Sequence, residues 1–167
     1  MAASEATTVE AGGRDLCVSS PERVIFPETE RSGALTKLDV VKYYLAVEDG
    51  IMRALERRPT TLERWPKGVH PGIVLSTREK GGGDAFFQKR VPRRAPDYLE
   101  TARIEFPSGR HADEICPTEI AVVGWAAQMG TMLLASPSPA SGWLGNPFHP
   151  HAADTASTYA AGAGNRS

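Results

Sequence analysis

The densest group of chemically capable side chains lies in residues 53–94, where eleven lysines and arginines are interleaved with three aromatic residues. These aromatic residues are Trp65, Phe86 and Phe87. Cations neutralise phosphates and aromatic faces stack on bases, so the composition is typical of a nucleic-acid-binding surface. An ordinary solvated surface also carries such charge, and the residues alone leave both interpretations open. Adjacent strand residues face opposite ways, so Phe86 and Phe87 cannot both enter the core of a two-layer sheet. Either one ring is exposed for stacking, or the sheet is covered on both faces.

A second candidate site is an anion pocket made by Ser20, Arg23 and Lys37. Ser20 followed by Pro21 is typical of a helix start, with serine as the N-cap and proline at the first helical position. A helix N-terminus offers free backbone N–H groups and a positive dipole end to a phosphate. Arg23 and Lys37 would complete the pocket if the fold brings them together, and ordinary helix capping is the alternative.

Catalytic signatures are absent from the sequence. Two-metal phosphoryl transfer uses paired carboxylates, usually at i and i+2 of one strand, and there is no Asp-x-Asp. The only acidic i, i+2 pair is Glu28 and Glu30, beside Pro27 in an expected loop. There is no phosphate-binding Gly-Lys-Ser/Thr loop and no Gly-x-Ser-x-Gly elbow. We therefore assign no catalytic residue, no metal ligand and no cofactor to this chain.

The elements that must position these residues alternate between helix and strand. Thr36 and Asp39 resemble a capping box, and an apolar face at helical spacing follows until Arg58 and Pro59 end the helix. A buried helix is expected over 117–129. Extended segments are expected at 16–18, 60–65, 73–76 and 85–90, with a hairpin of 103–106 and 111–116. The sequence thus predicts a mixed α and β domain.

Composition limits the class of protein. The chain has 167 residues, a net charge of −1, 41% hydrophobic residues and two cysteines. This is typical of a soluble globular protein in a reducing compartment, without a disulfide framework. No apolar run approaches the roughly 20 residues of a membrane span, and the first residues do not resemble a signal peptide. We expect no membrane partner.

The character of the sequence changes near residue 131. Of the last 36 residues, 21 are Ala, Ser, Gly or Pro, and only two are charged. Such a segment can bury little apolar surface. We therefore expect a disordered N-terminus at 1–13, a domain at 14–131 and a low-complexity, disordered tail at 132–167.

The order of several segments resembles the N-terminal part of the primase-polymerase domain of bacterial DNA ligase D and its stand-alone relatives. The segments are VSSPERVIFP (18–27), TKLDVVKYY (36–44), RPT (58–60), RWPKGV (64–69), FFQK (86–89) and PTEIAVVGWAA (117–127). The resemblance implies an archaeo-eukaryotic primase-like α/β (α+β) fold, here its incomplete N-terminal half, with a mixed sheet and flanking helices. It also implies DNA end repair by non-homologous end joining.

The resemblance also implies roles for individual residues. The family binds the 5′-phosphate of a break with an Asn and two Lys, whose equivalents here are Ser20, Arg23 and Lys37. The paired phenylalanines that contact DNA near the template end match Phe86 and Phe87. The remaining DNA contacts that we expect are Arg64 and Lys89.

The resemblance stops after residue 131. The family continues with a His-containing motif, an Asp-x-Asp strand and a later third Asp, and it uses Mn²⁺ or Mg²⁺ with NTPs. This chain has none of those residues in equivalent places. We expect a truncated relative that binds DNA ends and is inactive alone in nucleotidyl transfer. The alternatives are a non-functional frameshifted product and a non-catalytic partner of an intact polymerase or ligase.

Partners and location follow from the same resemblance. It implies binding to DNA ends, together with an end-binding Ku protein or a DNA ligase. It also implies a cytoplasmic, nucleoid-associated protein.

Overall fold

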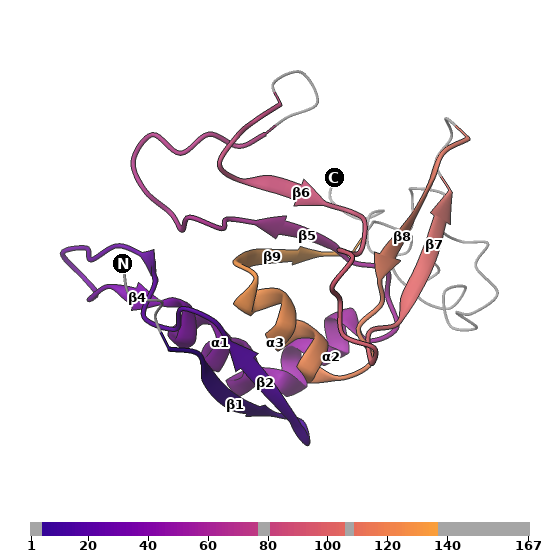
Figure 1. Ribbon diagram of the computed structural model, residues 1–167, viewed down its shortest axis with the longest axis horizontal. Helices are drawn as coiled ribbons and strands as arrows, with labels where there is room; N and C mark the ends of the chain where they lie inside the picture. Colours follow the sequence, from indigo (N-terminus) through magenta and orange to yellow (C-terminus); the bar gives the residue numbers. More distant parts are fainter. Residues whose placement is uncertain (1–4, 77–80, 106–108, 137–167) are drawn as a thin grey trace, which may run out of the picture.

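The computed structural model describes residues 5–76, 81–105 and 109–136 (Figure 1). Three helices and nine strands follow one another in this part of the chain. The N-terminal half contains β1 (Thr7–Ala11), β2 (Arg14–Val18), β3 (Val24–Phe26), β4 (Leu35–Thr36), α1 (Lys37–Ala46) and α2 (Glu48–Leu55). The second half contains β5 (Thr61–Arg64), β6 (Phe86–Gln88), β7 (Thr101–Glu105), β8 (His111–Ile115), α3 (Ile120–Gln128) and β9 (Thr131–Ala135). The predicted mixed α and β class is confirmed.

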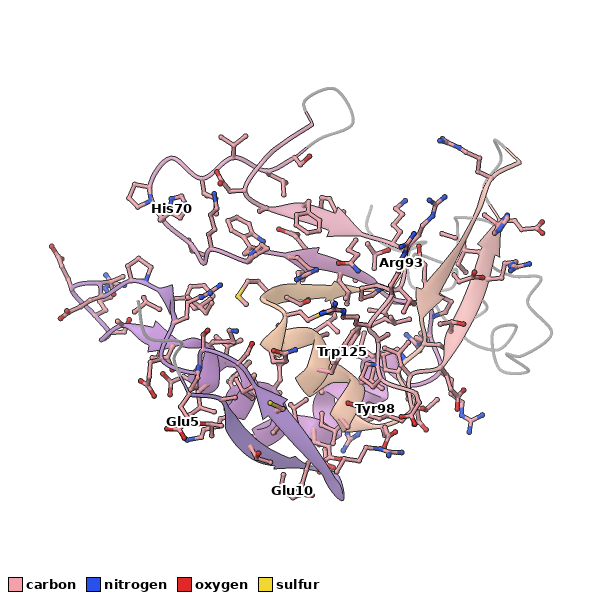
Figure 2. All side chains as sticks on the ribbon, in the orientation of Figure 1. Glu5, Glu10, His70, Arg93, Tyr98 and Trp125 are labelled. Atoms are coloured by element: carbon pink, nitrogen blue, oxygen red, sulfur yellow. The ribbon has the colours of Figure 1, made fainter. Side chains whose placement is uncertain are left out.

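Helix α3 is the centre of the core. Every residue from Ile120 to Ala127 is buried, as expected for a helix that is apolar all round. Figure 1 shows α3 between the β1–β2 hairpin and β9, and α3 also packs against α1. A Cβ at Gly124 would lie 2.8 Å from a methyl group of Leu16, so glycine lets the hairpin approach closely. The Trp125 side chain lies in the interior (Figure 2).

The capping box predicted at the start of α1 is confirmed. The Thr36 hydroxyl accepts a hydrogen bond from the Asp39 N–H, and the Asp39 carboxylate accepts one from the Thr36 N–H. The helical segment is divided at Val47 into α1 and α2, and α2 ends at Leu55 rather than at Arg58. The helix ends early because Arg57 adopts a left-handed φ of 54°. Its N–H donates to the Pro117 carbonyl and not to a carbonyl of α2.

The strands form small antiparallel sheets, of which the largest has the order β6-β5-β9. In this sheet Leu62 lies between Gln88 on one neighbour and Leu134 on the other. The β7–β8 hairpin is confirmed with a regular register. The strand expected over 73–76 is reduced to a single bridge between Leu75 and Ala85.

The N-terminus is more ordered than expected. Strand β1 pairs with β2 from Thr7↔Val18 to Ala11↔Arg14, so disorder of 1–13 is a wrong prediction for residues 7–11. The physical reason is burial, since Ala11 belongs to the hydrophobic core. At the other end, β9 continues the domain to Ala135, past the expected boundary at residue 131. The rest of the expected tail, 137–167, lies outside the described residues.

The two cysteines should differ in reactivity. Burial raises the pKa of the Cys116 thiol from its ordinary 9.0 to about 11, whereas the Cys17 residue is exposed. The thiolate is the nucleophile, so at pH 8 Cys116 should hold about a hundredfold less thiolate than an unperturbed thiol. Titration with a disulfide reagent should give one fast thiol, which Cys17→Ser removes. Loss of the fast phase in Cys116→Ser instead would contradict the assignment.

Candidate nucleic-acid interface

Cations from three separate segments converge on one hollow of about 270 Å³. One comes from the turn before β3, one from the first residue of α1 and one from the end of β5. The hollow is lined by Ser19, Arg23, Lys37, Arg64, Pro66, Gln128, Met129 and Gly130. The structure thus brings Arg23 and Lys37 together, as the sequence analysis required, and adds Arg64 to them.

Lys37 is the most buried cation of the hollow, with 6% of its surface exposed. Its ammonium donates hydrogen bonds to the Ser19 carbonyl and, at 3.5 Å, to the Ser19 hydroxyl. Burial lowers the pKa of the Lys37 ammonium, and the neighbouring Arg23 charge lowers it further. A bound anion would offset both effects, because a nearby negative charge stabilises the charged form of Lys37.

The other two cations are also held by neutral groups. Arg23 donates from Nη1 to the Pro66 carbonyl at 3.0 Å. Arg64 donates from Nε and Nη2 to the Met129 carbonyl at 3.2 and 2.8 Å. Within the described ranges, the ion pairs lie elsewhere, at Arg14–Glu119, Lys67–Asp84 and Arg103–Asp113. Three positive charges therefore meet without a carboxylate among the described lining residues, which favours an anionic ligand.

The helix start expected at Ser20 is wrong, because this segment forms a turn that caps α1. The Lys37 N–H donates to the Arg23 carbonyl at 2.8 Å, and the Leu38 N–H donates to the Pro21 carbonyl at 3.1 Å. The Pro21 and Arg23 carbonyls therefore accept hydrogen bonds from α1 and not from a helix that begins at Ser20. The same bonds satisfy the first N–H groups of α1, so the anion site consists of side chains rather than a free helix N-terminus.

Ser20 is not among the residues that line the hollow, although it was expected to bind the anion. Its φ of 49° is left-handed, and its carbonyl accepts the Arg23 N–H at 3.1 Å. Its neighbour Ser19 occupies the lining instead. Sequence reasoning missed Ser19 and the end of α3, since nothing in their local patterns indicates contact with Lys37.

The phenylalanine pair alternates as the strand geometry predicted. Phe87 is 50% exposed, whereas Phe86 is partly buried and lies under the Arg64 guanidinium, whose carbon is 5.4 Å from the ring centroid. Arg64 is paired with Phe86 across β5 and β6. Lys89 is exposed and directly follows β6. An exposed aromatic ring beside cations is the arrangement that base stacking requires.

Arg90 of the basic segment borders a second hollow of about 500 Å³. It is lined by Arg90, Val91, Gly109, Arg110, His111, Ala112 and Asp113. Asp113 is paired with Arg103 at 3.1 Å. Figure 2 shows Arg93 between the end of β6 and β8, on this side of the molecule. The described cations of 53–94 therefore lie at several places, from α2 to the segment that follows β6, rather than at one point.

Two classes of feature are absent from the described part of the chain. No helix there is both long and apolar enough to cross a membrane. No three His, Cys, Asp or Glu side chains gather there in an arrangement that could hold a metal ion.

Comparison with known proteins identifies the family. Residues 36–153 match the family described as LigD, primase-polymerase domain. The chain belongs to the LigD primase-polymerase family. Its match extends beyond residue 131, so the resemblance does not stop at the boundary that the sequence analysis placed there.

Relatives of this LigD-family chain include much longer proteins. The multifunctional non-homologous end joining protein LigD of Mycolicibacterium smegmatis is 30% identical over 69% of this chain. The bifunctional non-homologous end joining protein LigD of Bacillus subtilis is 28% identical over 59% of this chain. The chain spans 13% of the length of each of these relatives.

The primase-polymerase fold is confirmed by a solved structure. The polymerase domain of Mycobacterium tuberculosis ligase D, in complex with DNA, superposes with a TM-score of 0.59 at 26% identity. The match covers 73% of this chain and 37% of that one.

Proposed function

We propose that this LigD-family chain acts in non-homologous end joining as a module that binds the 5′-phosphate at a DNA break. The convergence of Arg23, Lys37 and Arg64 on one hollow without a paired carboxylate carries the proposal. The names of the relatives support the repair pathway, and the DNA complex of the similar polymerase domain supports the ligand.

The charges in the hollow favour a terminal phosphate over an internal one. A phosphate monoester carries a charge of about −1.5 to −2 at pH 7, whereas each backbone phosphate carries one negative charge. The desolvated Lys37 ammonium gains most from the extra charge, because burial has removed the water that would otherwise stabilise it. The arginine and lysine donors together suit several oxygens of one phosphate.

Phe87 and the cations near it would bind the DNA strand that follows the phosphate. The exposed ring can stack on a base, and such stacking contributes about 1–3 kcal/mol per base to binding. Lys89 adds electrostatic attraction that falls with rising salt. Ser20 keeps only an indirect role in this proposal, as part of the turn that positions Arg23.

Catalysis is not part of the proposed function. The sequence has no Asp-x-Asp with which to hold Mn²⁺ or Mg²⁺ for transfer from an NTP. Manganese-dependent extension of a gapped duplex by the pure chain would contradict this. Partnership with an end-binding Ku protein or a DNA ligase, at the nucleoid in the cytoplasm, completes the proposal. A frameshifted product without function would instead be poorly soluble and lack cooperative unfolding.

The decisive experiment compares DNA ends that differ only in the 5′-phosphate. Binding of labelled duplexes with 5′-phosphate and 5′-hydroxyl ends is measured by fluorescence anisotropy at fixed salt. We expect the wild type to prefer the phosphate, and Lys37→Ala to reduce that preference about tenfold, the size expected for a lost charged hydrogen bond.

The matched control is Lys42→Ala, on an exposed position of α1 outside the hollow. It removes the same charge from the same helix, so it should lower affinity for both ends equally and keep the phosphate preference. Equal preference in the wild type and in Lys37→Ala would contradict the proposed function.

A further inference from the structure

We infer that Arg64 couples the anion hollow to strand β6, so that a 5′-phosphate in the hollow strengthens base stacking on Phe87. The inference rests on the proposed function and deepens it. It changes the role expected for Arg64 from a simple DNA contact to a positioning residue that acts on the stacking aromatic ring.

The contacts of one guanidinium carry this inference. Arg64 lines the hollow and donates twice to the Met129 carbonyl at the end of α3. Its Nη1 donates to Gln88 Oε1 at 2.7 Å, and the guanidinium carbon lies 5.4 Å from the Phe86 ring centroid. A single side chain therefore touches the wall of the hollow and strand β6.

The two β6 residues that Arg64 contacts stand on either side of Phe87. Phe86 and Gln88 are its immediate neighbours in the chain, and together these residues make up the whole of β6. In the described sheet, β6 is an edge strand that pairs with β5 alone. Such a short edge strand has few bonds to define its position, so a side chain that holds both neighbours also sets where the Phe87 ring lies.

A phosphate would strengthen this arrangement. A guanidinium has five N–H donors in a rigid plane, of which three make the bonds described above. A phosphate contacting the plane would hold it against Met129 and Gln88. Ordering of β6 would then precede base stacking, and the second contact would cost less. A lysine has a single ammonium at its tip, so it cannot bond Met129 and Gln88 together in the geometry of the guanidinium.

A double-mutant cycle between the ligand and the protein measures the coupling. Affinity for 5′-phosphate and 5′-hydroxyl ends is determined in the wild type and in Phe87→Ala. We expect Phe87→Ala to cost more with the phosphate present, by a factor of about five, the lower end of typical coupling between sites. In Arg64→Lys the cost of Phe87→Ala should be the same for both ends.

Two further variants test whether the coupling runs through Arg64. Gln88→Leu removes the hydrogen bond from Arg64 to β6 but leaves the Phe86 ring and the place of Arg64 in the hollow, so it should reduce the coupling and keep the phosphate preference. It also replaces Arg64→Lys if that variant does not fold. Arg53→Lys, an exposed arginine on α2, is the matched control and should retain the wild-type coupling.

The possible failures are distinguishable. If the wild type does not distinguish the two ends, the proposed function fails and the coupling fails with it. If the wild type prefers the phosphate but Phe87→Ala costs the same for both ends, only the coupling is overturned. Coupling of the full wild-type size in Gln88→Leu would overturn the route through Arg64.

Discussion

Replacing Gly68 with alanine should lower the free energy of unfolding by about 3 kcal/mol or more, the range reached by severe single substitutions. Gly68 has a left-handed φ of 77°, which costs a residue with a Cβ about 1–2 kcal/mol. A Cβ there would also lie 2.8 Å from the Ile25 carbonyl oxygen and 2.9 Å from that of Val24. Both obstacles are backbone atoms, so no side-chain rotation relieves the collision.

The substitution should damage the anion hollow as well as stability. The turn at Gly68 is held to β3 by the Val69 N–H, which donates to the Ile25 carbonyl at 2.7 Å. The same turn supplies the Pro66 carbonyl that accepts the Arg23 guanidinium. Displacement of the turn would separate Arg23 from its acceptor, so the phosphate preference should fall together with stability.

Gly72→Ala provides the matched control for this prediction. Gly72 has a φ of 79°, and a Cβ there would meet nothing within 4 Å. Gly72→Ala should therefore lose only the cost of the left-handed backbone, about 1–2 kcal/mol. Urea unfolding of the two variants isolates the collision as the difference between them. Equal losses would show that the approach of Gly68 to β3 does not limit stability.

Replacing Ala11 with aspartate should have a comparably large effect, a loss of about 3 kcal/mol or more. Ala11 is 1% exposed and belongs to the core that α3 and β2 form. A carboxylate there would be buried in the apolar core, and Arg14, its partner across the hairpin, is already paired with Glu119. Burial of a charge is among the most costly changes in a protein interior. A lower midpoint of thermal unfolding, followed by circular dichroism, is the expected result.

An aspartate introduced on the other face of β1 provides the control. Thr8 is exposed, so Thr8→Asp should change stability by less than about 0.5 kcal/mol. The pair tests whether this segment is a folded strand. If the two variants unfold alike, the N-terminal hairpin does not contribute to the core.

The sequence alone determined the features that depend on near neighbours. The capping box needs only Thr36 and Asp39, because the bonds that define it span three residues. The pairing of β7 with β8 and the uniformly apolar helix α3 also follow from residues that lie close together in the chain. Alternation along β6 correctly separated Phe86 from Phe87, because a strand has a period of two.

Tertiary packing overrode two expectations from the sequence near the N-terminus. Residues 1–13 were expected to be disordered, but the β1–β2 hairpin packs on α3. Ser20 and Pro21 resembled a helix start. Their segment instead gives its carbonyls to α1, 14 or more residues later in the chain, a use that no local pattern predicts.

The hollow itself is a product of tertiary structure. The sequence supplied Arg23 and Lys37 as cations, but their meeting depends on the turn before β3 lying against the start of α1. Arg64 joins them because β5 lies beside the end of α3, where Met129 accepts its guanidinium. Spacing along a chain determines local hydrogen bonds and exposed faces, whereas distant side chains meet only where the buried core places their elements.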